Sequence, residues 1–115
     1  MTMHAQSTLA QLVDVLGLTE VRSLVELYLD HTAAELQRLA ALPVDKQIMT
    51  VHAIKGSSSQ LGAKVFAAQC RAMEMQLRDT RQALTSVELE ALQQEFSTAG
   101  ESFRVWLRET NPQDP

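Results

Sequence analysis

Residues 48–62 read Ile-Met-Thr-Val-His-Ala-Ile-Lys-Gly-Ser-Ser-Ser-Gln-Leu-Gly, a stretch that joins a helical pattern to residues that weaken a helix. A glycine inside a helix costs about 1 kcal/mol relative to alanine, and here a glycine is followed by three serines. The stretch is therefore either one continuous helix or two short helices joined by a loop at 56–59. Apolar or small side chains recur at steps of three and four, which favours the continuous helix. The positions on this face are Ile48, Val51, Ile54, Ser58 and Leu61.

A continuous helix places His52, Lys55, Gly56 and Ser59 on a second stripe, because residues three and four apart are neighbours on a helix surface. This stripe is rotated away from the apolar one, so it lies at the edge of the core or in solvent. The imidazole then has a cation one turn along the helix. A residue without a side chain lies beside it, which lets another protein approach the backbone closely.

Helical periodicity continues on both sides of this stretch and predicts five helices. Their expected ranges are 9–16, from 19 or 20 to 42, from just after 45 to 61, 64–78 and 86–106.

Local signals mark where several of these helices begin and end. Pro43 ends the second helix because its ring cannot continue a helix, and Asp45 is a suitable N-cap for the third. Gly62 indicates the next break. Thr85 and Glu88 have the spacing of a capping box that opens the last helix.

Short connections between long helices make neighbouring helices antiparallel. The sequence therefore predicts an all-α protein, an antiparallel four-helix bundle with a short additional N-terminal helix. The predicted bundle forms a single domain over residues 1–115, with 1–7 and 111–115 frayed. Four glycines and three prolines are too few for an all-β chain of 115 residues.

Composition also excludes several functions. The apolar runs are only a few residues long, and the N-terminus lacks a secretory pattern, so we expect a cytoplasmic protein without a membrane span. Cys70 is the single cysteine, so no internal disulfide can form. We find no P-loop, no kinase ATP-binding signature and no metal-ligand motif, so we expect no ATP-dependent kinase activity and no metal.

Charge is unevenly distributed along the chain. Residues 46–81 contain six basic and two acidic residues, whereas the remainder contains four basic and twelve acidic ones. The overall net charge of −4 argues against binding of nucleic acid. The basic segment is either a set of solvated helix faces or a patch for an acidic partner or a phosphate.

Residues 52–63, His-Ala-Ile-Lys-Gly-Ser-Ser-Ser-Gln-Leu-Gly-Ala, resemble the signature of histidine-containing phosphotransfer (HPt) domains. That signature is a histidine, any residue, an aliphatic residue, Lys-Gly, small residues, and then an aliphatic residue before Gly-Ala. Members of the family are four-helix bundles of about this length, so the resemblance covers essentially the whole chain. The ending Phe103-Arg104-Val105-Trp106 is also similar to small free-standing phosphotransferases of bacterial quorum-sensing relays.

The resemblance implies a role for each residue that matches the motif. His52 would accept a phosphoryl group on Nε2 from the phospho-aspartate of a response-regulator receiver domain and pass it to another receiver. Lys55 would stabilise the phosphate charge, Gly56 would give the receiver room to dock, and Ser59 would help to keep the helix surface small. A hybrid sensor histidine kinase is the expected source of the phosphoryl group. The chain needs no cofactor of its own, since Mg²⁺ would belong to the receiver, and a monomer is expected.

Antiparallel geometry adds three candidates on the next helix. If the chain turns near Gly62, then Arg71 and Glu74 lie near the level of His52. Glu74 could accept a hydrogen bond from the other ring nitrogen, and Arg71 or Arg78 could meet phosphate or the acidic rim of a receiver. The alternative is that all three are solvated surface charges. An alternative for the whole protein is an adapter bundle that binds and occludes a receiver without being phosphorylated.

Overall fold

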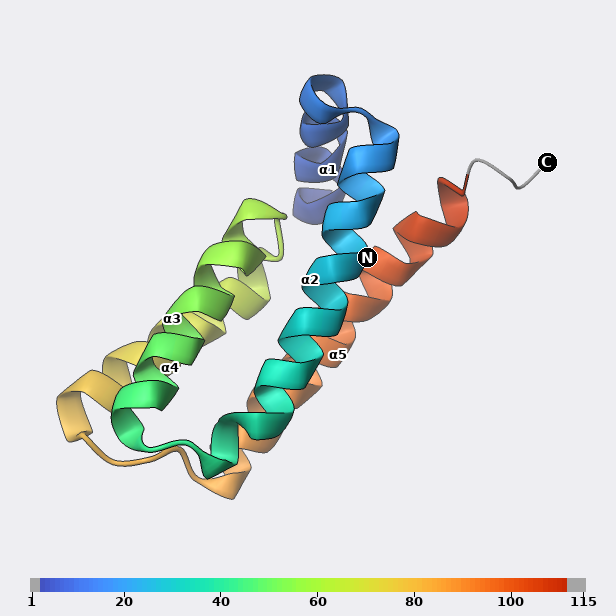
Figure 1. The fold of residues 1–115 in the computed structure, drawn as a ribbon. Coiled ribbons are helices and arrows are strands. Elements are labelled where there is room, and N and C mark those ends of the chain that lie inside the picture. The colour runs from blue at the N-terminus through green and yellow to red at the C-terminus, as the bar shows by residue number, and fades with distance from the viewer. Residues whose placement is uncertain (1–2, 112–115) are drawn as a thin grey trace.

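The computed structural model describes residues 3–111, and within that range the chain is helical, with no strand. A short 3₁₀ turn, η1, covers Leu39–Ala41 and tightens the chain before Pro43. Figure 1 shows the order of the elements along the chain. The α-helices are α1 (Met3–Leu16), α2 (Leu18–Arg38), α3 (Val44–Gln60), α4 (Lys64–Thr80) and α5 (Ser86–Glu109).

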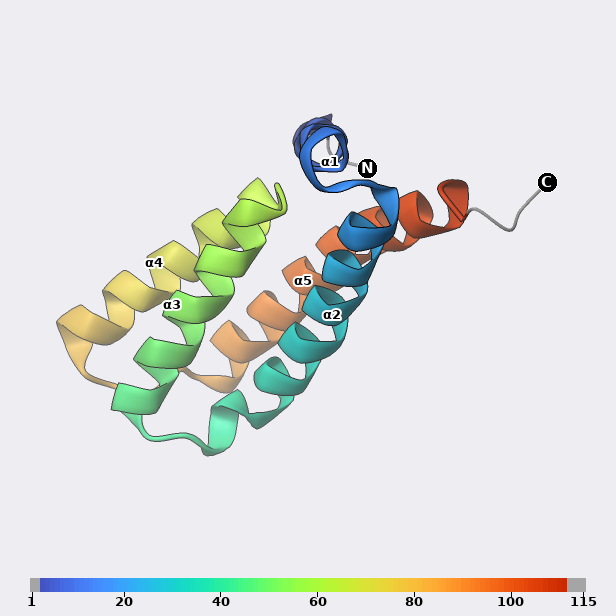
Figure 2. The same ribbon diagram turned by 45° about the horizontal axis from the view of Figure 1, so that its top comes forward.

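Helices α2 to α5 form the predicted antiparallel bundle, and α1 packs against α2 and α5 at one end of it (Figures 1 and 2). The closest pairing is between α3 and α4, which are joined by only three residues, 61–63. Gly62 makes this short turn possible because its φ of 89° is a conformation that L-residues rarely adopt. The turn fixes the register of α3 against α4.

Aromatic side chains link three of the four bundle helices. Tyr28 of α2 meets Phe96 and Phe103 of α5 edge-on, with ring centroids 6.1 and 5.6 Å apart. The ring centroid of Phe66 in α4 lies 5.4 Å from that of Phe96. Cys70 is also buried in this core, and burial raises the pKa of its thiol to about 12, so the thiol is inert. The apolar faces of the helices thus close on one another.

Helix α3 runs without a break through Gly56 to Gln60, which confirms the continuous helix rather than two helices and a loop. Ser58 is fully buried on its inner face, and its Oγ lies 2.6 Å from the Tyr28 hydroxyl. A Cβ added at Gly56 would meet no heavy atom within 4 Å, so this position opens onto free space. The two weak helix formers therefore serve opposite faces of one helix.

The ends of the helices test the capping predictions. The Thr85–Glu88 capping box is confirmed, since Thr85 Oγ1 accepts from the Glu88 backbone N–H and Glu88 accepts from the Thr85 N–H. The prediction of Asp45 as N-cap is wrong. The Pro43 carbonyl already accepts the first helical bond, from the Gln47 N–H at 2.9 Å, so α3 begins at Val44. Asp45 lies in the first turn, where its carboxylate pairs with Arg81.

The N-terminal helix is longer than expected. We predicted that residues 1–7 are frayed, but α1 begins at Met3. Residues 3–6, Met-His-Ala-Gln, include good helix formers, and they continue directly into the turn that holds the buried Leu9. The described range excludes residues 1–2. It also excludes residues 112–115, which belong to the C-terminal segment that we predicted to fray.

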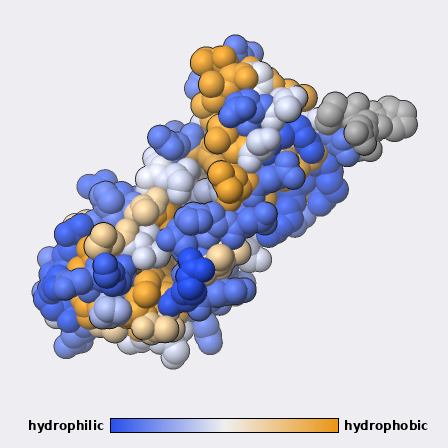
Figure 3. All heavy atoms as spheres, viewed as in Figure 1, coloured by the Kyte–Doolittle hydropathy of each residue, from blue (hydrophilic) through white to orange (hydrophobic). Residues whose placement is uncertain are grey.

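Apolar side chains remain accessible where α1 meets α2 (Figure 3). Leu16 and Leu27 are 46% and 66% exposed, and they line a groove of about 570 Å³ between α1, α2 and α3 together with Leu12 and Leu24. Helix α1 therefore covers only part of the apolar surface of α2.

Replacing Gln47 by methionine is expected to lower the free energy of unfolding by about 2 kcal/mol. Gln47 is fully buried, donates to the Leu39 carbonyl and accepts from the Leu84 N–H, both at 3.0 Å. Methionine keeps the volume but leaves both backbone groups unpaired. Urea unfolding measures the loss, and Gln37→Met on the exposed surface is the control. Equal stability of the two variants would show that this buried bridge contributes nothing.

Candidate functional site

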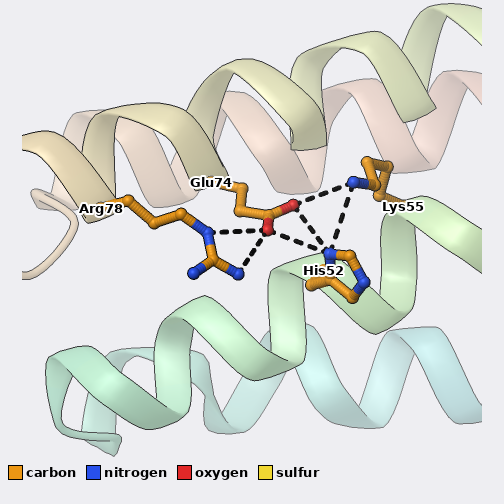
Figure 4. A network of polar contacts seen from close by, with 4 residues as sticks. All are labelled: His52, Lys55, Glu74 and Arg78. Atoms are coloured by element: carbon orange, nitrogen blue, oxygen red, sulfur yellow. Dashed lines mark hydrogen bonds and ion pairs between the residues drawn. The ribbon is translucent and has the colours of Figure 1, made fainter.

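Two pairs of side chains face one another between α3 and α4. The two members of each pair lie one helical turn apart on the same helix. His52 and Lys55 come from α3, and Glu74 and Arg78 come from α4 (Figure 4). The short turn at 61–63 makes these helices antiparallel neighbours and brings the two pairs level.

The Glu74 carboxylate is the centre of this polar network. Its oxygens lie 3.0 and 3.1 Å from Nδ1 of His52. Lys55 Nζ donates to Oε1 at 3.1 Å, and Arg78 donates through Nε and Nη2 to Oε2 at 3.0 and 2.8 Å. One carboxylate thus binds the imidazole and two permanent cations at once.

Exposure differs sharply within the network. The Glu74 side chain is only 8% exposed, whereas His52 is 59% exposed. The buried carboxylate is enclosed by its partners, and the imidazole it holds faces solvent. The exposed edge of the ring is therefore reachable by another molecule without any movement of the core.

The electrostatics of Glu74 follow from this enclosure. Burial alone would raise the pKa of the carboxyl, but hydrogen bonds from Arg78, Lys55 and His52 outweigh burial and lower the pKa to about 2. Glu74 is consequently a carboxylate at neutral pH. Its single negative charge faces two fixed positive charges, those of Lys55 and Arg78.

The ionised state of Glu74 fixes the tautomer of His52. A carboxylate can only accept hydrogen bonds, so Nδ1 carries the proton and Nε2 keeps the lone pair of a neutral ring. Lys55 Nζ lies 3.4 Å from the same Nδ1, but an ammonium and an N–H are both donors, so the bond of Lys55 is to Glu74. Figure 4 shows Nε2 on the side of the ring that points away from Glu74.

Changing Glu74 to glutamine is expected to alter how stability depends on pH. The lowered pKa means that Glu74 stabilises the fold above its unfolded value of 4.5, and that this contribution is lost as pH falls toward 2. Near pH 6 the free energy of unfolding of wild type should exceed that of Glu74→Gln by a few kcal/mol. This difference in stability should shrink as the pH falls from 4.5 to 2. Denaturant unfolding across that range measures it. A difference that does not change with pH would exclude the charge of Glu74 as its cause.

The other predicted site residues lie next to this network but not in it. Gly56, Ser59 and Arg71 are exposed and line a groove between α3 and α4 that continues from Lys55 toward the 61–63 turn. Arg78, rather than Arg71, reaches Glu74.

Sequence reasoning missed two features. Lys64, the first residue of α4, lines the same groove, and its spacing of seven from Arg71 was the available signal. The ion pair between Lys55 and Glu74 was also not predicted, because Lys55 was expected to be available to an anion on the imidazole.

Two general searches complete the description of the site. Within residues 3–111, no group of three or more His, Cys, Asp or Glu side chains is placed to hold a metal ion. The helices of that range include none with the length and apolar character needed to cross a membrane.

An all-α bundle with a solvent-exposed histidine that is oriented by a buried carboxylate and flanked by cations has the features of a protein that carries a phosphoryl group. Comparison with known families agrees, since the model of the Hpt domain matches residues 23–102. The chain belongs to the Hpt domain family, whose members carry out histidine phosphotransfer in phosphorelay signalling and interact with receiver domains and kinases. Neither the curated proteins nor the solved structures contain a match.

Proposed function

We propose that His52 is the phosphoacceptor of a phosphorelay intermediate, which takes a phosphoryl group from the phospho-aspartate of one receiver domain and gives it to another. The observation that carries this proposal is the contact of Nδ1 with Glu74, which leaves the Nε2 lone pair on an exposed edge of the ring. The histidine also lies in the part of the chain that matches the family.

The proposed chemistry is an in-line displacement at phosphorus. The Nε2 lone pair forms the new P–N bond while the P–O bond to the donor aspartate breaks, and the donor leaves as a carboxylate. The proton on Nδ1 stays in place, so the ring becomes a phosphorylated imidazolium whose positive charge faces Glu74. Phosphoryl transfer depends mainly on positioning and charge stabilisation, and this arrangement supplies both. The second transfer reverses these bonds toward the next receiver.

Lys55 is the residue we assign to the phosphoryl oxygens. Its side chain is 29% exposed and lies one turn from His52, so its ammonium can exchange the Glu74 oxygen for a phosphoryl oxygen nearby. Arg78 would then keep Glu74 neutralised. Mg²⁺ is assigned to the receiver.

The surroundings of His52 suit contact with a protein. Gly56 leaves open space one turn beyond the histidine, and Met49, one turn before it, is 62% exposed. Met75, which follows Glu74, is 56% exposed.

We propose a monomer that acts in the bacterial cytoplasm downstream of a hybrid sensor histidine kinase.

Phosphoryl transfer from a panel of phosphorylated receiver domains tests the proposal, with intact-mass detection. We expect an adduct of one phosphoryl group that is labile in acid and stable in alkali, as a phosphohistidine is. Binding of receivers with no adduct from any of them would favour the occluding adapter instead. If no receiver either transfers a phosphoryl group to the protein or binds to it, both the relay function and the adapter function are contradicted.

A further inference from the structure

A basic groove lies beside the network, between α3 and α4. It has a volume of about 750 Å³ and continues from Lys55 along α4. Its three cations are Lys55, Lys64 and Arg71, and its small residues include Gly56, Ala67 and Ala68. We call this feature the basic groove.

Two of the three cations of the basic groove are uncompensated. Lys55 is paired with Glu74, but Lys64 and Arg71 form no ion pair with any carboxylate of residues 3–111. No acidic residue lines the groove. The groove also lies within the segment 46–81, which carries a net charge of +4, whereas the rest of the chain carries −8.

The spacing of the two unpaired cations indicates what they can bind. Lys64 and Arg71 are seven residues apart on one helix, which is a rise of about 10 Å. Two cations that far apart match two carboxylates spread over a protein surface better than a single phosphate group. The small side chains between α3 and α4 let a second backbone come close.

We propose that the basic groove receives an acidic segment of the receiver, and that Lys64 and Arg71 determine which receivers exchange phosphoryl groups rapidly with His52. This inference rests on the proposed function and names the recognition chemistry of its partner. Acidic side chains of the receiver are steered to the groove and held there while the phospho-aspartate lies over His52. Complementary charge at the edge of an interface acts mainly on the rate of association.

Charge reversal at both positions tests the inference. We expect Lys64→Glu/Arg71→Glu to lower kcat/KM for transfer from a phosphorylated receiver about tenfold at low ionic strength. The maximal rate at saturating receiver should stay the same, and the deficit should shrink at high salt because screening removes long-range attraction. Arg38→Glu/Lys46→Glu makes the same change of net charge at the opposite end of α3 and should retain wild-type kinetics. Circular dichroism checks that all variants fold.

Two further measurements separate this inference from the proposed function. Phosphoramidate, a small phosphoryl donor with ammonia as its leaving group, should label His52 equally in wild type and in the groove variant. If no receiver phosphorylates wild type, the affinity of unphosphorylated receivers still tests the groove, and it should fall about tenfold in the variant alone. Equal loss in both double variants would overturn the inference. Stronger binding of heparin or RNA than of any receiver would overturn it as well.

Discussion

His52→Gln should lose all phosphoryl acceptance while its melting temperature stays within about 3 °C of wild type. Glutamine has no nitrogen lone pair that can attack phosphorus. Its amide N–H can still donate to Glu74, which keeps the buried carboxylate partnered. Because the histidine side chain is 59% exposed, little packing is lost. Intact-mass detection after incubation with phosphorylated receivers measures acceptance, and thermal unfolding measures stability.

The chain offers a matched control for this substitution. His31 is also an exposed histidine, 66% by side chain, and its Nε2 lies 3.0 Å from Glu35 one turn along α2. His31→Gln makes the same chemical change at another helix surface and should retain full phosphoryl transfer. A large loss of stability in His52→Gln would make His52 a structural residue, and transfer that survives in this variant would place the phosphoryl group elsewhere.

Gly56→Gln is expected to stabilise the protein and to slow transfer, so that stability and activity move in opposite directions. Replacing a helical glycine removes a penalty of about 1 kcal/mol, and nothing within 4 Å obstructs a new Cβ. A long side chain there would instead meet the docked receiver. Excess bulk in a well-packed contact costs about 1–3 kcal/mol, so we expect kcat/KM to fall by about 5- to 150-fold.

Gly56→Ala separates the two effects. Alanine and glutamine have similar helix propensities but differ greatly in size, so both variants should gain similar stability. Only the larger side chain should slow transfer from receivers strongly. Labelling by phosphoramidate should be unaffected in either variant, because the small donor needs no docking surface. Equal kcat/KM in wild type and in Gly56→Gln would remove the argument that a receiver approaches closely at this position.

Much of the architecture could be predicted because the apolar spacing of each helix survives its weak helix formers. Ile54, Ser58 and Leu61 keep their stripe across Gly56, and α3 is continuous as that spacing indicated. The start of α3 was placed incorrectly because capping preference alone favoured Asp45. The hydrogen bond from the Gln47 N–H to the Pro43 carbonyl depends on the direction that proline gives the backbone. The preference of aspartate for N-cap positions carries no information about that direction.

The site could be predicted in outline but not in its details. Counting outward from the turn at Gly62 brought Glu74 near His52, and the structure places them in contact. The counting left both Arg71 and Arg78 as neighbours of the site. Arg78 reaches Glu74 because a cation four residues after a glutamate lies on the same helix face. Glu74 is buried by the packing of two helices against each other, which no local sequence pattern describes. Because it is buried, Glu74 forms an ion pair with Lys55, so this ion pair could not be predicted either.

The three-residue connection between α3 and α4 has a consequence for the direction of signalling. His52 and Glu74 are carried by two helices that are held in register by one tight turn, so donor and acceptor receivers would meet the same arrangement. In the proposed relay, arrival and departure of the phosphoryl group are then one reaction run in opposite directions. Mass action would govern the net flow, through the ratio of phosphorylated donor to unphosphorylated acceptor. A cell could reverse such a relay by changing the pools of its partners, with no change in this protein.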